Sequence, residues 1–287
     1  MRKLFVCIAL GLTTLTGNAA SPLWMRDVQI SPDGTEIAFC YKGDIYKVSA
    51  GGGTAIQLTT QPSYECTPIW SPDSKQIAFA SDRNGNFDIF VMPATGGTAQ
   101  RLTTHSSSEL PSAFTPDGKY ILFSASIQDP SQSALFPTTA MTELYKVPVN
   151  GGRTEQVLGT PAEAVCYAPS GEFFLYQDRK GFEDEWRKHH TSSITRDIWL
   201  YDTKTGKHTN LTNHAGEDRN PVLSPDGKSV YLLSERKGSF NVYSFPLDNA
   251  QDLKAVTSFK THPVRFLSMS HGGTLCYAYD GEIYTQK

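Results

Sequence analysis

The chain has 287 residues, of which 39% are hydrophobic and 19% are charged, so it can form an ample globular core. Its formal net charge is −3 at pH 7, and loss of Arg2 and Lys3 with a cleaved leader would make it −3 − 2 = −5. This negative balance excludes nucleic-acid binding as the default function.

Residues 1–20 have the features of a secretory signal peptide. Arg2 and Lys3 form a basic start, Leu4–Leu15 is a mostly apolar run, and Gly17–Ala20 supplies small residues for cleavage. The apolar run is too short for a normal transmembrane helix, and no other stretch of the sequence could cross a membrane. We therefore expect the protein to be periplasmic or secreted after the leader is removed.

A turn motif of the form Ser-Pro-Asp-Gly recurs along the rest of the chain. Proline presets the backbone of the first central position, aspartate bonds its own backbone, and glycine accepts a positive φ. Successive copies begin between 40 (71 − 31) and 56 (224 − 168) residues apart. Four close copies and two degenerate ones begin at Ser31, Ser71, Thr115, Ala168, Ser224 and Ser270.

Strands of alternating character flank every copy of the turn. An apolar strand precedes it, the first running over Trp24–Ile30. The strands that follow the turn cover Glu36–Phe39, Gln76–Phe79, Tyr120–Phe123, Phe173–Tyr176, Val230–Leu233 and Thr274–Tyr277. Third strands cover Asp44–Val48, Asp88–Val91, Glu143–Val147, Asp197–Tyr201, Asn241–Ser244 and Glu282–Tyr284. Gly-Gly turns at Gly52, Gly96 and Gly151 and Leu-Thr pairs at Leu58, Leu102 and Leu211 mark fourth strands.

Four short antiparallel strands in each unit of roughly 40 to 50 residues are typical of propeller blades. The six units predict an all-β protein in which residues 21–287 form one six-bladed β-propeller. The last unit stops at Lys287 with neither a Gly-Gly turn nor a fourth strand, so we expect an incomplete last blade. Because proteins usually avoid open edge strands, we interpret the chain as the front part of a longer protein.

Blades 3 and 4 carry long inserts between their second and third strands, at residues 127–142 and 180–196. Both inserts therefore emerge on the same face of the disc, and inserts confined to one face often mark a binding face. The alternatives are simple variation in loop length and a Trp186 side chain that packs over the base of its own loop. The candidate peptide-binding residues of the blade 4 insert are Trp186, Arg187, His189, His190 and Arg196.

The sequence contains no arrangement typical of catalysis or metal binding. His189 and His190 follow three acidic residues, but adjacent side chains of an extended segment point to opposite faces, and no ligand pair four residues apart occurs. Ser192 and Ser193 lie close by in sequence, yet no Gly-x-Ser-x-Gly motif occurs in the chain. We therefore expect no catalytic residue, no metal and no cofactor.

Four cysteines follow the leader, in four different predicted blades: Cys40, Cys66, Cys166 and Cys276. In an oxidising compartment they could form disulfides. Strands of different blades seldom bring two cysteines close enough to bridge, so buried free thiols are the favoured interpretation.

The repeated elements Ser-Pro-Asp-Gly, Ile-Ala-Phe, Asp-Ile-Tyr and Gly-Gly…Leu-Thr resemble the TolB-type (PD40) propeller repeat across nearly all of residues 21–287. That repeat is shared by TolB, by tricorn-like peptidases and by propellers of prolyl-oligopeptidase-type hydrolases. Two stretches, Pro22–Arg26 and Trp186–Trp199, resemble the beginning of the propeller and the long blade 4 segment of tricorn-like peptidases. The chain thus resembles the N-terminal propeller of a tricorn-like serine peptidase.

This resemblance implies a non-catalytic module that binds or gates peptides or unfolded protein segments. In that family the catalytic serine lies in later domains, so no catalytic residue carries over to this chain. The implied partners are downstream peptidase domains or further copies of the chain. The alternative is a stand-alone TolB-like interaction propeller of the periplasm, and a third possibility, a prolyl-oligopeptidase-type propeller, would need a Gly-x-Ser-x-Gly domain beyond Lys287.

Overall fold

The structure is a computed structural model that describes residues 24–127, 141–182, 186–187 and 192–287. The predicted signal peptide at residues 1–20 lies outside the described residues, as do His189 and His190. The described residues form 23 β-strands and no helix, and hence none long and apolar enough to cross a membrane.

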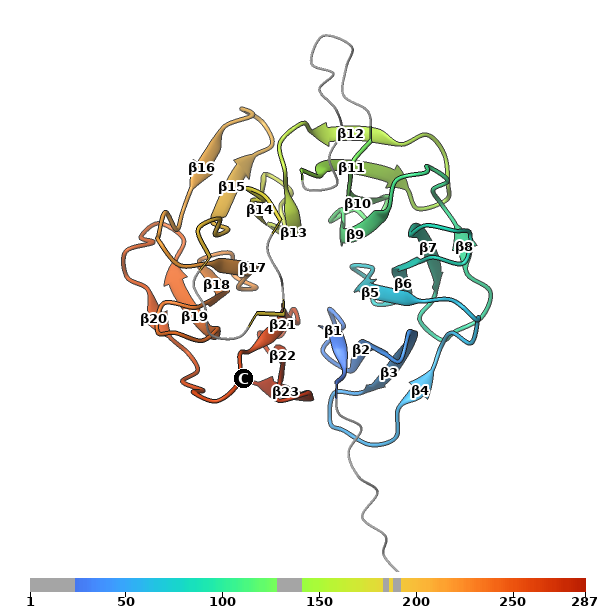
Figure 1. Cartoon of the computed structure of the whole chain (residues 1–287), viewed down its shortest axis with the longest axis horizontal. Helices are drawn as coiled ribbons and strands as arrows, with labels where there is room; N and C mark the ends of the chain where they lie inside the picture. Colours follow the sequence, from blue (N-terminus) through green and yellow to red (C-terminus); the bar gives the residue numbers. More distant parts are fainter. Residues whose placement is uncertain (1–23, 128–140, 183–185, 188–191) are drawn as a thin grey trace, which may run out of the picture.

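Six antiparallel sheets are arranged radially around a central axis (Figure 1). Within each sheet the strands follow one another in chain order, with the first strand of each blade nearest the axis. Every hairpin therefore steps one place outward, and the chain then crosses to the inner strand of the next blade. This is the predicted all-β, six-bladed propeller.

The strands of blades 1 and 2 are β1 (Arg26–Ile30), β2 (Glu36–Tyr41), β3 (Asp44–Ser49), β4 (Ile56–Gln57), β5 (Glu65–Trp70), β6 (Gln76–Ser81), β7 (Asp88–Pro93) and β8 (Gln100–Arg101). Blades 3 and 4 contain β9 (Glu109–Phe114), β10 (Tyr120–Ala125), β11 (Glu143–Pro148), β12 (Glu155–Leu158), β13 (Glu163–Tyr167), β14 (Phe173–Gln177), β15 (Ile198–Asp202) and β16 (His208–Asn210). Blades 5 and 6 contain β17 (Asp218–Leu223), β18 (Ser229–Ser234), β19 (Asn241–Pro246), β20 (Lys254–Ala255), β21 (Arg265–Met269), β22 (Leu275–Tyr279) and β23 (Glu282–Gln286).

The core lies between the blades. Each of six clusters of buried apolar side chains joins one blade to its neighbour. The cluster that closes the ring packs Val28 and Phe39 of blade 1 against Cys276 and Ala278 of blade 6. Because each blade is apolar on both faces, it is stable only with a neighbour on each side.

The recurring turn is held by its own side chains. In blade 1 the Ser31 hydroxyl donates to Asp33 Oδ1 at 2.6 Å and accepts the Glu36 N–H at 3.0 Å. Asp33 also accepts the Thr35 N–H at 2.9 Å, and Gly34 adopts a φ of 76°. The serine bond and the backbone bond hold the pKa of Asp33 below its ordinary value. Equivalent hydroxyl–aspartate bonds recur in blades 2, 3 and 5, which explains the motif.

The Leu-Thr pair attaches the end of each fourth strand to the third. In blade 1 the Leu58 N–H donates to the Ile45 carbonyl, and the Thr59 hydroxyl accepts the Ile45 N–H at 2.9 Å. Blades 2 and 4 repeat both bonds. The threonine hydroxyl thus extends the pairing of the fourth strand, which in these three blades has only two or three residues.

Fourth strands are more widespread than the Leu-Thr pairs indicate. Blades 3 and 5 also have them, as β12 and β20, and in blade 5 Val256 and Thr257 make the contacts of Leu-Thr. The Leu-Thr pattern does not identify this pair, because Val256 stands in the place of the leucine. The described residues of blade 6 form three strands, which confirms the prediction of an incomplete last blade.

All four cysteines of the described residues are free thiols, as favoured above. Cys40, Cys66 and Cys276 are buried, and Cys166 is half-buried. Burial raises the pKa of Cys40 and of Cys276 to about 12, so these thiols stay protonated at neutral pH. They act as small apolar residues of the inter-blade packing.

The Thr59 contact leads to a stability prediction. Thr59→Val keeps the side-chain volume but leaves the buried Ile45 N–H without its acceptor, and we expect a loss of about 1–3 kcal/mol of unfolding free energy. Urea unfolding followed by circular dichroism measures it. The matched control is Thr60→Val, because Thr60 is exposed. Equal effects of the two substitutions would contradict this role of the hydroxyl.

Candidate functional site

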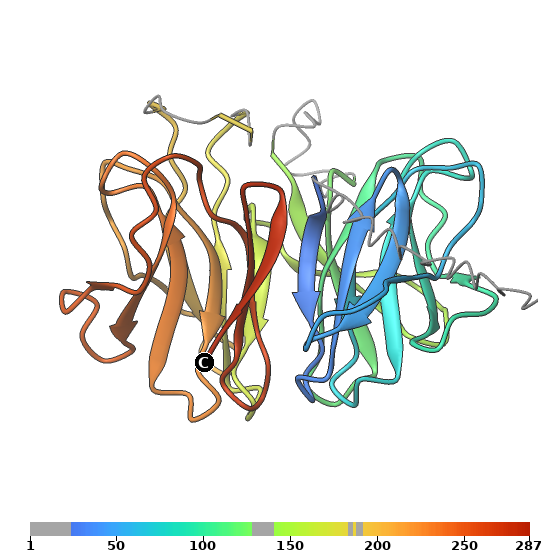
Figure 2. The same ribbon diagram turned by 90° about the horizontal axis from the view of Figure 1, so that it is seen from below.

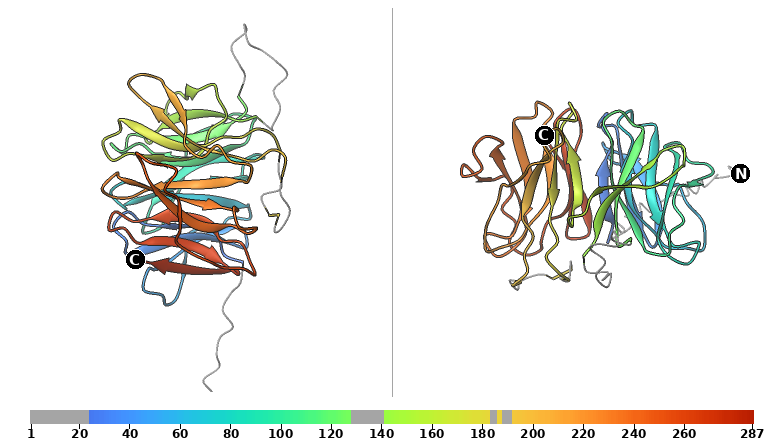
Figure 3. Two further views of the ribbon diagram at one scale, coloured as in Figure 1. Left: turned by 90° about the vertical axis from the view of Figure 1, so that its left-hand side faces the viewer. Right: turned by 90° about the horizontal axis from the view of Figure 1, so that it is seen from above.

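The described ends of the blade 3 and blade 4 inserts lie on the same face of the disc (Figures 2 and 3). This agrees with their position between the second and third strands of their blades. We call this side the insert face. The candidate site lies there, where the blade 4 insert approaches the inner strands of blades 5, 6 and 1.

Trp186 packs against the inner strands of blades 6 and 1. Its ring centroid is 6.0 Å from that of Phe266 in β21, and the guanidinium carbons of Arg26 in β1 and Arg265 in β21 lie 4.5 and 5.1 Å from its ring. Its exposed fraction is 47%. Trp186, which is carried by the blade 4 insert, thus contacts residues of blades 6 and 1.

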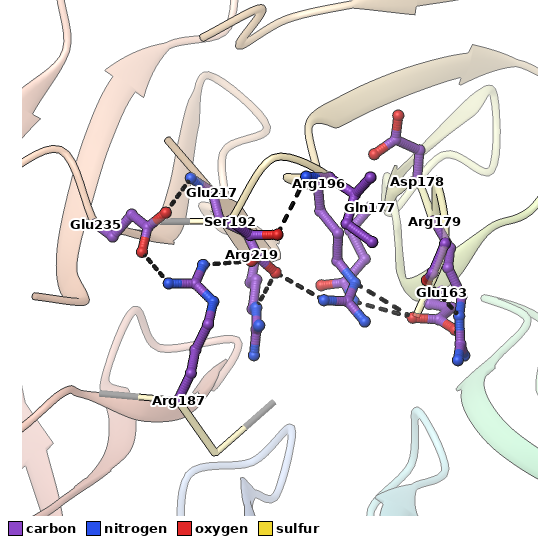
Figure 4. A network of polar contacts seen from close by, with 12 residues as sticks. Glu163, Gln177, Asp178, Arg179, Arg187, Ser192, Arg196, Glu217, Arg219 and Glu235 are labelled. Carbon is purple, nitrogen blue, oxygen red and sulfur yellow. Dashed lines mark hydrogen bonds and ion pairs between the residues drawn. The ribbon is translucent and has the colours of Figure 1, made fainter. Parts of the chain in front are cut away.

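Arg187 and Arg196 are buried in one ion-pair network, shown in Figure 4. Arg187 lies 2.5 Å from Glu217 Oε2 through Nη2 and 2.5 Å from Glu235 Oε2 through Nη1. Arg196 Nη1 is 2.7 Å from Glu217 Oε1, and Arg219 of β17 also donates to that oxygen. A single carboxylate therefore holds three guanidinium groups and attaches the blade 4 insert to blade 5.

The network continues into blade 4. Glu163 Oε1 accepts from Arg179 Nη1 at 2.8 Å, and Glu163 Oε2 lies 3.7 Å from Arg196 Nε (Figure 4). Lys180 Nζ donates to Asp197 Oδ2 at 2.6 Å. Charged contacts therefore hold the chain at both ends of the insert. Arg179 and Lys180 make them at its start, and Arg196 and Asp197 at its end.

The charges of this network support one another. Burial opposes ionisation of Glu217, but Arg219, Arg187 and Arg196 outweigh it and lower the pKa of Glu217 to about 2. Burial likewise opposes the charge of Arg187, yet its two glutamates raise the pKa of the guanidinium above its usual range. Glu217 and Arg187 are therefore both charged at neutral pH, and their ion pair positions the chain next to Trp186.

Arg26, Arg219 and Arg265 were missed by sequence reasoning. Each lies five residues before the first residue of the turn motif of its blade, so the three occupy equivalent positions in blades 1, 5 and 6. Blades 2 and 3 carry Cys66 and Leu110 at this position. If the repeats are aligned on the turn motif, this position is an arginine in blades 1, 5 and 6 and an uncharged residue in blades 2 and 3.

A β-bulge follows this position in most blades, and it marks the level of the site. In five inner strands the next residue has a left-handed φ between 48° and 59°, and the ladder shifts register there. Bulges bend a strand and redirect side chains, and they are common beside functional sites. The residues concerned are Asp27, Thr67, Ala164, Asn220 and Phe266.

Two cavities meet at Trp186. One, of about 180 Å³, lies on the axis and is also lined by Arg219, Asn220 and Phe240. The other, of about 460 Å³, lies at the seam of blades 1 and 6. Arg265 and Phe266 also line both cavities. A third cavity, of about 340 Å³, opens among the Ser-Pro-Asp turns at the other end of the axis.

The arrangement suits binding. In the part of the chain that the structure describes, no group of three or more His, Cys, Asp or Glu side chains could hold a metal ion. Ser192 Oγ accepts the Ile194 N–H of its own loop at 3.1 Å. The site combines half-exposed aromatic rings with guanidinium groups beside a cavity, which are typical elements of a binding surface.

The family model of the tricorn protease N-terminal beta propeller domain matches residues 22–287. The chain belongs to this family. Among solved structures, the tricorn protease superposes on this tricorn-type propeller with a TM-score of 0.76 and 22% identity, covering 92% of this chain and 25% of that one. A putative TolB from Agrobacterium tumefaciens has a TM-score of 0.68 and 18% identity over 93% and 91% of the two chains. Both likenesses describe the fold.

Sequence similarity to curated proteins is partial. An uncharacterized peptidase, YuxL of Bacillus subtilis, is 32% identical over 72 residues, which are 25% of this chain and 10% of that protein. The uncharacterized protein Atu1656 of Agrobacterium fabrum is 31% identical over 108 residues, 37% of this chain and 33% of that protein. The tricorn-type propeller therefore spans a third or less of the length of these relatives.

The ion-pair network leads to a prediction about Glu217. Glu217→Gln leaves three buried guanidinium groups without their shared carboxylate, and we expect the unfolding free energy to fall by about 3–5 kcal/mol at pH 7. The control is Glu172→Gln, which removes an exposed pair with Lys204 and should change stability little. Urea unfolding of both variants measures the difference, and equal small effects would contradict the assigned role.

The same comparison has a predicted pH dependence. Because the pKa of Glu217 is lowered by folding, its contribution is fully present above the ordinary value of 4.5 and is lost as pH falls towards about 2. The stability difference between the parent and Glu217→Gln should therefore be constant from pH 5 to 8 and shrink below pH 4.

Proposed function

We propose that this chain is the non-catalytic propeller module of a tricorn-like serine peptidase that is secreted or periplasmic, and that it binds or gates peptides on its insert face. The observation that carries the proposal is Trp186, a half-exposed ring in contact with two arginines of the inner strands of blades 1 and 6. Peptide sites commonly use such aromatic and arginine anchors.

The residues of the proposed site have different roles. Trp186 contacts the peptide, whereas Arg187 and Arg196 are buried against glutamates and position the insert. His189 and His190 belong to the same insert and remain part of the proposal. Such anchoring supports binding, because a surface that is already ordered loses less conformational entropy when a peptide binds.

Two further parts of the proposal concern context. Residues 1–20 are the leader that delivers the chain across the membrane. The partners are peptidase domains downstream or further copies of the chain, and the 25% share of the tricorn protease that this chain covers supports such domains. The second candidate is a stand-alone TolB-like interaction propeller, which the 91% coverage of the Agrobacterium structure supports.

Peptide binding is tested with Trp186→Ala. We expect this variant to bind a fluorophore-labelled unstructured peptide about tenfold more weakly, measured by fluorescence anisotropy, because it loses a central aromatic anchor. Ile56→Ala is the control, since Ile56 is an exposed apolar residue on the outer strand β4 (Figure 1). Unchanged binding by Trp186→Ala, or an equal loss in both variants, would overturn the proposed site.

The two candidate functions are distinguished by the intact mass of the native protein isolated from its source cells. The peptidase module predicts a mass several times the 31.6 kDa of this chain. A mass close to that of residues 21–287 would instead support the stand-alone propeller.

A further inference from the structure

The cavity at the seam of blades 1 and 6 has the size and walls of a ligand pocket. Its volume is about 460 Å³, within the range of small-molecule and side-chain pockets. β1 and β21 line it together with Trp186 of the blade 4 insert, so three blades contribute. The ring closes at this seam, where the inner strands of the first and last blades meet.

Aromatic side chains form much of the pocket wall. Trp24 is 71% exposed and Trp186 is 47% exposed, although both are large apolar rings. Phe266 adopts a φ of 59° at its bulge, and its ring meets that of Trp186 edge to face. A wall of this kind favours an apolar side chain of a ligand.

Arg26 differs from the arginines of the neighbouring network. Its guanidinium carbon lies 4.5 Å from the centroid of the Trp186 ring, and among the described residues Arg26 has no carboxylate partner. Arg187 and Arg219, in contrast, both contact Glu217. A guanidinium stacked on an indole keeps its planar fork of donors in a fixed orientation, which suits a carboxylate.

Arg265 and Asp280 are further charged groups in the wall of this pocket. Arg265 Nη2 donates to the backbone oxygens of Trp186 at 3.1 Å and Arg187 at 3.2 Å. Asp280 Oδ1 lies 3.2 Å from His262 Nε2. Arg26 and Arg265 give the pocket two positive groups against the one carboxylate of Asp280, so an acidic ligand group complements its charge.

We propose that this pocket binds an acidic side chain of a peptide, with the carboxylate on Arg26 and the neighbouring apolar residue against Trp24 and Trp186. The proposal rests on the proposed peptide-binding function and adds a preference for acidic sequence. It assigns that preference to the seam of blades 1 and 6, away from Arg187 and Arg196.

Two peptides test this preference. Both are acetylated and amidated, so that neither has a terminal charge, and they differ only in Glu or Gln beside a phenylalanine. We expect the Glu peptide to bind the full chain about tenfold more tightly, because hydrogen bonds to a charged group contribute more than those to a neutral one. The preference should shrink at high salt, since it is electrostatic.

Arg26 variants locate the preference. Arg26→Gln should reduce it to nearly one, and Arg26→Lys, which keeps the charge but not the fork, should retain part of it. The control is Arg153→Gln, which removes the same charge from an exposed turn and should keep the full preference. Circular dichroism of each variant confirms folding.

The outcomes separate the two proposals. A full preference in Arg26→Gln, or an equal loss in Arg153→Gln, overturns the pocket assignment. If both peptides bind the parent equally, the acidic preference is wrong and peptide binding stands. If neither these peptides nor longer unstructured ones bind, the proposed function fails, and the pocket proposal fails with it.

Discussion

The fold depends on burial between blades. Each sheet has an apolar side chain layer on both faces, so it must pack against two neighbours, and a ring is the arrangement that gives every blade two. The ring closes where Val28 and Phe39 meet Cys276 and Ala278. This closure also creates the pocket at the seam, because it brings β1 and β21 side by side although they are far apart in the chain.

Ion pairs hold the insert face together, whereas buried apolar side chains hold the core together. Glu217 holds Arg187, Arg196 and Arg219 at once, and Glu235 also pairs with Arg187, so two carboxylates attach the blade 4 insert to blade 5. A buried ion network of this kind is costly to desolvate, and removing one partner is strongly destabilising because the remaining charges are left buried and unpaired. Here it positions the chain next to Trp186, the residue on which the proposed binding surface depends.

Much of the fold was predictable, because each blade repeats local chemistry. Ser31 and Asp33 hold their turn with bonds inside five residues, and Thr59 bonds a neighbouring strand of the same blade. Such short-range contacts leave a visible motif. The Leu-Thr pattern does not mark the fourth strand of blade 5, because Val256 replaces the leucine while Thr257 keeps the contact.

The sequence by itself determined the number of blades, the strands around each turn and the face from which the inserts emerge, since these follow from local turn chemistry and strand alternation. Only the tertiary structure decided that Trp186 crosses to blades 6 and 1, that Arg187 and Arg196 are buried, and that Arg26 faces an aromatic pocket. These contacts join residues from different blades. No local pattern encodes them, because they exist only once the ring has closed.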